Sequence, residues 1–258
     1  EIEQALGEAL AKRQLSLRYQ PIVRLSDRRC VAAEALLRWS HPDLGDIPPD
    51  EFIPVAERSG HIEEIGRFVI GRAIEDLVAW RSRTEPGFRV SINVSPRQFR
   101  DGSIAERIIE ELGRADLPGA ALEIEVTEGL LLSERVEVRH ALERLRGHGV
   151  GLVMDDFGSG YASLGYLRDY PFSSLKIDRS FVSRLDSDSR HRKLVVSAIR
   201  LGKALEMQVI AEGVETEEEL SVLEAEGCEL VQGYLFGRPI MAESMIRFLD
   251  RRSPEAAD

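Results

Sequence analysis

The sequence predicts an α/β fold, a (β/α)₈-type barrel formed by a chain of 258 residues. Strand-like apolar runs alternate with amphipathic helical segments along almost the whole chain, a pattern typical of parallel sheets covered by helices. Polar side chains also stand at the ends of five of these runs, directly before turn signals: Asn93, Glu125, Asp155 with Asp156, Lys176 and Glu212. Because the C-terminal ends of barrel strands form one face, these side chains are expected to converge there. Such convergence favours an enzyme, and several carboxylates in one pocket need cations to neutralise them.

Eight runs are interpreted as strands because apolar and β-branched residues alternate or cluster in them between turn signals. They cover residues 15–23, 30–39, 88–94, 121–126, 150–155, 174–177, 207–211 and 229–231. The first two follow each other with no helix between them, so the barrel is expected to begin irregularly.

Helical periodicity is clearest over residues 62–80, where apolar side chains recur at helical spacing. Further helices are expected over residues 1–15, 103–114, 134–147, 191–206 and 216–226. Two of these helices begin with a capping box, Ser103 with Glu106 and Thr216 with Glu219.

The remaining segments are short. Residues 41–52, rich in Pro, Gly and Asp, are interpreted as a loop. No internal repeat or interior linker is visible, so one domain is expected over residues 1–250, followed by a frayed tail over 251–258. The abrupt helical start indicates a piece of a longer protein.

The charge balance narrows the range of partners. The chain has 34 basic and 45 acidic residues, a net charge of −11, which argues against a nucleic-acid polymer or an anionic membrane as a partner. A phosphate ligand would have to be held locally. Cys30 and Cys228 show no paired spacing, and the five histidines show no metal-binding motif. Reduced thiols in a cytoplasmic protein are therefore expected, and a zinc site is not.

Adjacent aspartates end the run VGLVMDD. Neighbours on a strand point to opposite faces, so both can serve one site only where the strand breaks. Residues 157–160, Phe-Gly-Ser-Gly, are expected to supply that break. A solvated turn is the alternative, but the other strand-end carboxylates favour a metal site. In that site Asp155 would bridge two ions while Asp156 binds one.

Lys176 is informative because lysine is rare in this chain. Arginine predominates, and the lysines are Lys12, Lys176, Lys193 and Lys203. The use of lysine between Leu175 and Ile177 suggests that this position needs the compact charge of an ammonium and not the planar guanidinium of arginine. An ion-paired or snorkelling lysine is the alternative. At a strand end near metal ions, Lys176 would hold a nucleophilic water or stabilise phosphorane charge.

Glu34 lies in an apolar run where an unpaired carboxylate would be unfavourable. Arg38 is one candidate partner, although two strand residues four positions apart share a face at too great a distance for an easy ion pair. The alternative is a shared pocket in which Glu34 binds metal and Arg38 binds phosphate. Asn93 offers a neutral oxygen to a hard cation, or else forms a turn before Ser95 and Pro96.

Three further glutamates are assigned supporting roles. Glu128 and Glu215 each lie three residues beyond a candidate ligand. They are expected to anchor loops or to hydrogen-bond to the residues that bind the metal, without binding it themselves. Glu123 is expected to be structural.

The motif EALLRW at 34–39 follows YQPIV and precedes INVS, EVTE, DDFGSGYASL, LKIDRSFV, AEGVET and QGYLFGRP. Through these eight blocks, in order, almost the whole chain resembles the EAL domain family of cyclic di-GMP phosphodiesterases. The resemblance implies a TIM-like barrel with an antiparallel first strand and two Mg²⁺ or Mn²⁺ ions. It also implies hydrolysis of cyclic di-GMP to linear pGpG. Family members commonly form homodimers and carry an upstream sensory or GGDEF-like domain, so the resemblance implies both. A membrane tether of the full-length protein is left open.

The resemblance also assigns roles to individual residues. The first metal site would comprise Glu34, Asn93, Glu125 and Asp155, and the second Asp155, Asp156 and Glu212. Lys176 would hold the water, Glu212 would be a ligand or the general base, and Glu128 would anchor the DDFG loop. Gln20, Arg38 and Gln232 match positions around the substrate.

Two alternatives remain open at this point. The first is an EAL domain that binds cyclic di-GMP as a sensor or scaffold without cleaving it. The second is an enolase-like barrel, disfavoured by the Asp-Asp pair. For the homodimer, Leu164, Leu167 and Tyr170 form a helical stripe that would serve either as the interface or as barrel core.

Overall fold

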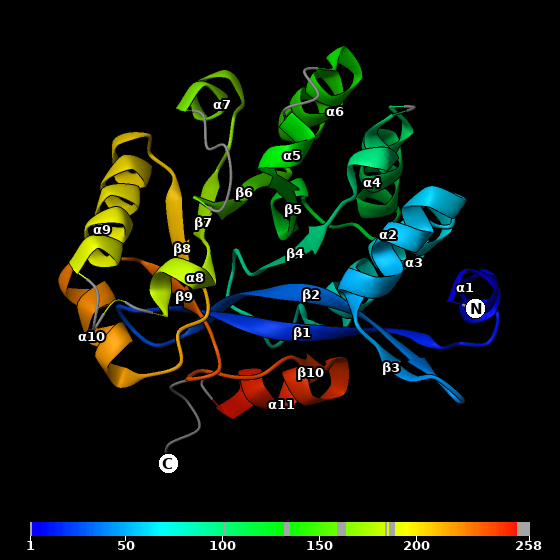
Figure 1. Cartoon of the computed structure of the whole chain (residues 1–258), viewed down its shortest axis with the longest axis horizontal. Helices are drawn as coiled ribbons and strands as arrows, with labels where there is room; N and C mark the ends of the chain where they lie inside the picture. The colour runs from blue at the N-terminus through cyan, green and yellow to red at the C-terminus, as the bar shows by residue number, and fades with distance from the viewer. Residues whose placement is uncertain are drawn as a thin grey trace.

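The computed structural model describes residues 2–100, 102–131, 135–158, 164–183, 185 and 189–251. Ten strands in this part of the chain form one sheet in the order β10-β1-β9-β8-β7-β6-β5-β4-β2-β3, and β1 also pairs with β2. All strands except β3 and β10 therefore close into a barrel, and helices surround it (Figure 1). The predicted α/β barrel is confirmed.

The barrel begins with an antiparallel strand. β1 (Leu15–Arg24) pairs antiparallel with β2 (Cys30–His41) and with β9 (Leu230–Gln232). A short turn joins β1 to β2, and a connection without a crossover helix can only produce an antiparallel pair. The other barrel strands pair in parallel: β4 (Arg89–Asn93), β5 (Leu122–Thr127), β6 (Gly151–Phe157), β7 (Ser174–Ile177) and β8 (Gln208–Ala211).

The helices follow the predicted order with shifted ends. They are α1 (Ile2–Ala9), α3 (Ile62–Trp80), α4 (Ser103–Arg114), α6 (Val136–Gly147), α9 (Ser189–Ala204) and α10 (Glu217–Ala225). The helical stripe over residues 164–170 corresponds to α7 (Leu164–Asp169). Short helices not anticipated from the sequence are α5 (Glu128–Leu131), α8 (Arg179–Val182), η1 (Pro96–Phe99) and η2 (Gly119–Ala121). At the C-terminal end, β10 (Ile240–Met241) leads into α11 (Ala242–Arg251), and the predicted tail beyond it lies outside the described residues.

The assignment of residues 41–52 to a loop was wrong. This stretch contains β3 (Gly45–Ile47) and the start of α2 (Pro49–Ser59). Pro49 occupies the first helical turn, where the missing N–H would have had no partner, so proline here begins a helix. The helix ends at Gly60, whose φ of 84° is the left-handed conformation of a helix C-cap.

One of the two predicted capping boxes is present. Thr216 accepts a hydrogen bond from the Glu219 amide, and the Glu219 carboxylate accepts one from the Thr216 amide. Helix α4 instead has Gly102 as its N-cap, with no side-chain cap bond. The Glu106 carboxylate forms an ion pair with Arg144 at 2.7 Å, which takes it away from a capping role.

The stripe considered for a dimer interface belongs to the core. Leu167 and Tyr170 are only 7% and 5% exposed and pack in the main hydrophobic cluster. That interface assignment is therefore wrong for these two residues, because neither is available to a partner, and the Leu164 side chain lies outside the described part. Cys30 and Cys228 are buried free thiols, in keeping with the sequence interpretation.

Candidate active site

Lys176 stands at the centre of the polar end of the barrel. It is 1% exposed, and its Nζ lies 3.0 Å from Glu125 Oε1, 3.2 Å from Glu34 Oε2, 3.4 Å from Asp155 Oδ1 and 2.6 Å from Glu212 Oε1. The four carboxylates come from β2, β5, β6 and the segment just after β8. Parallel register at the strand ends brings these residues, distant in sequence, around one ammonium.

Burial and mutual interaction shift the pKa values of Lys176 and of the carboxylates around it. Burial alone would lower the pKa of the Lys176 ammonium, but the four carboxylates raise it well above its usual value. Burial, then repulsion from Glu34, raises the pKa of the Glu125 carboxyl well above normal. Burial raises the pKa of the Glu34 carboxyl, but the Lys176 ammonium and the hydrogen bond from Gln232 lower it more. The pKa of Glu34 is therefore below its usual value. One cation is therefore too little charge for all of these carboxylates.

Amide side chains hold Glu34 in place. Its Oε1 accepts a hydrogen bond from Asn93 Nδ2 at 3.1 Å, and its Oε2 accepts one from Gln232 Nε2 at 2.6 Å. Gln232 also donates to Gln20 Oε1 at 3.1 Å, and Gln20 donates to the carbonyl oxygen of Gly237 at 3.2 Å. The structure thus joins the proposed ligands Glu34 and Asn93 to the proposed substrate residues Gln20 and Gln232 in one network.

Ser91 is a member of this site that the sequence analysis missed. Its hydroxyl donates to Glu125 Oε1 at 2.7 Å and fixes that carboxylate. Ser91 precedes Asn93 by two positions on β4, so shared strand parity was the signal available in the sequence.

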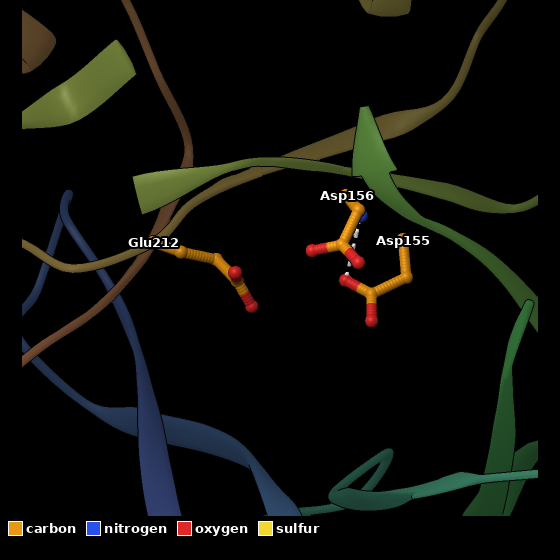
Figure 2. A group of neighbouring side chains, drawn as sticks. All are labelled: Asp155, Asp156 and Glu212. Carbon is orange, nitrogen blue, oxygen red and sulfur yellow. Dashed lines mark hydrogen bonds between the residues drawn. The ribbon is translucent and has the colours of Figure 1, made fainter. Parts of the chain in front are cut away.

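Asp155, Asp156 and Glu212 form an acidic cluster. Ligand oxygens of the three residues lie within 4.8 Å of one another, and Figure 2 shows the carboxylates turned toward a common space. The Asp156 amide donates to Asp155 Oδ1 at 2.9 Å. Asp156 has a φ of 54°, and the pairing of β6 with β7 shifts between Met154 and Phe157. This bulge turns both aspartates toward the site.

The bulge corrects one detail of the sequence interpretation. The break was expected over residues 157–160, but β6 continues through Phe157 and the irregularity lies at Asp156 itself. Aspartate tolerates the left-handed conformation better than most residues, so the chain needs no glycine at that position.

The donor set fits divalent cations. All candidate ligands are carboxylate or amide oxygens, which Mg²⁺ and Mn²⁺ accept. Buried oxygens Glu125 Oε2 and Gln232 Oε1 have no hydrogen-bond donor within the described part of the chain. Burial, then Asp155, raises the pKa of Asp156 to about 6, and burial, then Glu34 and Asp155, raises that of Glu212 to about 7. A cation would relieve both the unpaired oxygens and the repulsion.

The remaining candidates lie around this centre. Arg38 donates to the Leu37 carbonyl oxygen at 2.8 Å and forms no ion pair with Glu34, so the structural alternative for this pair does not hold. Glu215 is exposed and pairs at 3.3 Å with Arg179, a cavity-lining residue that the sequence analysis missed. Glu123, as expected, has a structural partner in Arg89 at 2.9 Å. Glu128 begins α5, but its side chain and residues 159–163 lie outside the described part.

Two cavities open beside the carboxylates. One of about 270 Å³ is lined by Gln20, Glu34, Asp155, Asp156, Lys176, Arg179, Glu212, Gly213, Glu215, Gln232, Gly233 and Tyr234. The other, about 550 Å³ and more apolar, includes Arg38, Asn93 and Glu125. Together they place the acidic centre between a polar and a largely apolar hollow, an arrangement suited to an elongated ligand with charged and aromatic parts.

The protein-family model described as the EAL domain matches residues 3–239 of this sequence. The chain belongs to the EAL domain family. This EAL domain is 40% identical over 249 residues to the cyclic di-GMP phosphodiesterase NbdA of Pseudomonas aeruginosa, covering 96% of this chain and 32% of that protein. It is 39% identical over 241 residues to the bifunctional diguanylate cyclase/cyclic di-GMP phosphodiesterase MucR of the same organism, covering 93% and 35%. The chain thus spans about a third of the length of these curated relatives.

Solved structures of EAL domains share the architecture. The PaMucR phosphodiesterase in complex with c-di-GMP superposes with a TM-score of 0.89 at 38% identity, covering 95% of this chain and 99% of that one. The EAL enzyme Bd1971, in a form bound to cAMP and cyclic-di-GMP, superposes with a TM-score of 0.91 at 34% identity, covering 96% and 68%. None of the helices in the described part of this chain has the length and hydropathy needed to cross a bilayer.

The raised pKa values predict pH-dependent metal binding by this EAL domain. Asp156 and Glu212, with pKa values of about 6 and about 7, are protonated more readily in the folded than in the unfolded chain. The metal-free protein should therefore lose stability as the pH rises through this range. Because cations bind the ionised carboxylates, Mg²⁺ affinity should rise over the same range, with proton release. Calorimetric titration in buffers of different ionisation enthalpy measures both quantities. Affinity that is independent of pH, with no proton released, would contradict the assignment.

Proposed function

We propose that this EAL domain hydrolyses cyclic di-GMP to linear pGpG with two Mg²⁺ or Mn²⁺ ions. The observation that carries the proposal is the set of four carboxylates converging on buried Lys176. The names of the relatives support the substrate, since NbdA and MucR are both designated cyclic di-GMP phosphodiesterases.

The first ion would be held by Glu34, Asn93, Glu125 and Asp155, and the second by Asp155, Asp156 and Glu212. When bound, divalent cations lower the pKa of a water molecule and neutralise charge on the phosphate and on the leaving oxygen. Two cations also attract a dianionic substrate to a chain with a net charge of −11.

Lys176 and Glu212 would handle the proton of the attacking water. Their side chains lie 2.6 Å apart, so a water held by the ammonium also lies near the carboxylate. Glu212 is the proposed acceptor of that proton, because its carboxylate lies beside the ammonium that would hold the water. Attack on phosphorus then breaks the bond to the 3′ oxygen, which leaves and is protonated from solvent. The Glu212 carboxylate has two oxygens, and it lies near both Lys176 and the aspartates, so it is proposed to ligate the second ion as well as to accept the proton.

Polar groups around the centre would position the dinucleotide. Gln20 and Gln232 are already bound to each other beside Glu34, so a ligand there meets an ordered pair of amides. Arg38 lines the larger cavity, and its guanidinium, which donates to the Leu37 carbonyl oxygen through one nitrogen, is proposed to bind a phosphate. Glu128 and Glu215 are proposed to hold the neighbouring loops. By analogy with bifunctional MucR, a GGDEF-like or sensory domain in a longer, cytoplasmic protein is the proposed regulatory partner.

Incubation of the purified chain with cyclic di-GMP and Mg²⁺ or Mn²⁺, followed by nucleotide chromatography, tests the reaction. We expect pGpG as the product and complete loss of activity in EDTA. Stoichiometric binding without pGpG, across both metals and a range of pH values, would instead establish the sensor or scaffold alternative. The same assay over a range of protein concentrations tests the proposed homodimer, which predicts that specific activity rises with concentration.

A further inference from the structure

Tyr234 places an exposed aromatic ring at the rim of the candidate active site. It follows β9 by two residues, is 43% exposed, and lines the same cavity as Lys176 and Glu212. The Arg238 guanidinium lies over the ring, with Cζ 4.1 Å from the ring centroid. What distinguishes this exposed ring is its position beside the polar cavity, where it offers a flat apolar face to a ligand.

The backbone holds this ring in place without help from the ring itself. Val214 donates to the Gln232 carbonyl oxygen and accepts from the Leu235 amide, both at 3.1 Å. A Cβ on Gly233 would lie 2.1 Å from the Val214 carbonyl oxygen, so glycine permits this close approach. Leu235 and Phe236 pack against the hydrophobic core beside the ring. The folded turn therefore presents Tyr234 to the cavity, and the tyrosine side chain contributes little to folding.

The surroundings of the ring favour an anionic aromatic ligand. Within the described residues, neither Arg238 nor Arg38 forms an ion pair with a carboxylate, although many other arginines of the chain do. An aromatic ring that carries a guanidinium with no carboxylate partner, at the rim of the polar cavity, matches a nucleotide, which has both a π-face and phosphates.

We propose that Tyr234, backed by Arg238, is the platform on which one nucleobase of the bound dinucleotide stacks. This inference rests on the proposed function and deepens it by assigning the residue that contacts a base rather than the reacting phosphate. Every base has a π-face, and stacking on an exposed aromatic ring requires no further polar groups. Tyr234 is accordingly a substrate-positioning residue and takes no part in metal binding.

Kinetics of Tyr234→Leu and Tyr234→Phe in the 258-residue chain test the assignment. Tyr234→Leu should raise KM for cyclic di-GMP, and Kd for a hydrolysis-resistant phosphorothioate analogue, by roughly 5- to 150-fold, the range for loss of one base-aromatic stack. Its kcat and its Mg²⁺ affinity should stay near wild type. Tyr234→Phe, which keeps the ring, should retain wild-type Kd. Leu205→Ala is the matched control, because Leu205 is 42% exposed and lines neither cavity of the site.

The outcomes separate this inference from the proposed function. Wild-type KM and Kd in Tyr234→Leu, in a preparation that hydrolyses cyclic di-GMP, would overturn the stacking role and leave the proposed function intact. Equal losses in the leucine and phenylalanine variants would assign the contact to the hydroxyl and would also overturn stacking. A wild-type chain that neither binds nor hydrolyses cyclic di-GMP would overturn both proposals.

Discussion

Replacing Lys176 with methionine should lower kcat for cyclic di-GMP by ~10²–10³-fold or more, the range for removal of one preorganised electrostatic partner. Methionine keeps much of the length and removes the charge. The attacking water would then lose its proposed ammonium partner, while the carboxylate and amide oxygens that bind metal stay in place. Steady-state kinetics with saturating Mg²⁺, and calorimetry to show that metal still binds, measure the two effects separately.

The same substitution should destabilise the metal-free protein. The Lys176 ammonium contacts Glu34, Glu125, Asp155 and Glu212, and removal of one partner from a buried ion pair costs about 3–5 kcal/mol. Thermal unfolding in EDTA should show a large drop in Tm that Mg²⁺ substantially restores. Lys193→Met, at an exposed position on α9, is the matched control and should behave as wild type. A Lys176→Met variant with unchanged Tm in EDTA, or with wild-type turnover, would refute the central role of this lysine.

Asp155→Asn should damage activity more than Asp156→Asn. Asp155 is 8% exposed, contacts Lys176 at 3.4 Å and accepts the Asp156 amide hydrogen bond, whereas Asp156 lies at the more open side of the cluster. Neutralising Asp155, the proposed bridging carboxylate, would weaken the binding of both ions, whereas neutralising Asp156 would weaken the binding of one. We expect a loss of ~10²–10³-fold for Asp155→Asn and a smaller loss for Asp156→Asn.

Metal stoichiometry gives the sharper measurement of this difference. Calorimetry should show both binding events weakened in Asp155→Asn and one largely retained in Asp156→Asn. The side-chain oxygen of asparagine can still accept the hydrogen bond at position 155, so the fold should survive. Asp116→Asn, at a side chain that is 99% exposed, is the control for the chemical change alone. Identical losses of activity and metal in the two site variants would refute the bridging assignment.

The barrel could be predicted from the sequence because its strands are short apolar runs with clear boundaries. Residues 174–177 were predicted as a strand, and β7 has the same bounds. Helix α2 escaped prediction because Pro48 and Pro49, with the Gly and Asp residues before them, are local turn signals, although proline suits a first helical turn. The antiparallel direction of β1 came from the family resemblance. The residues themselves indicated only that no helix separates it from β2.

The oxygen and nitrogen groups at the strand ends could be identified from the residues alone, because side-chain parity along a strand is a local property. Which of these groups meet became visible only in the folded barrel. It placed Lys176 among four carboxylates, joined Ser91 and Gln232 to the site, and left Arg38 apart from Glu34. It also put the break of β6 at Asp156. The physical reason is that contacts across a barrel depend on the register of all its strands and on how the ring closes, and both are set by long-range packing that no single segment specifies.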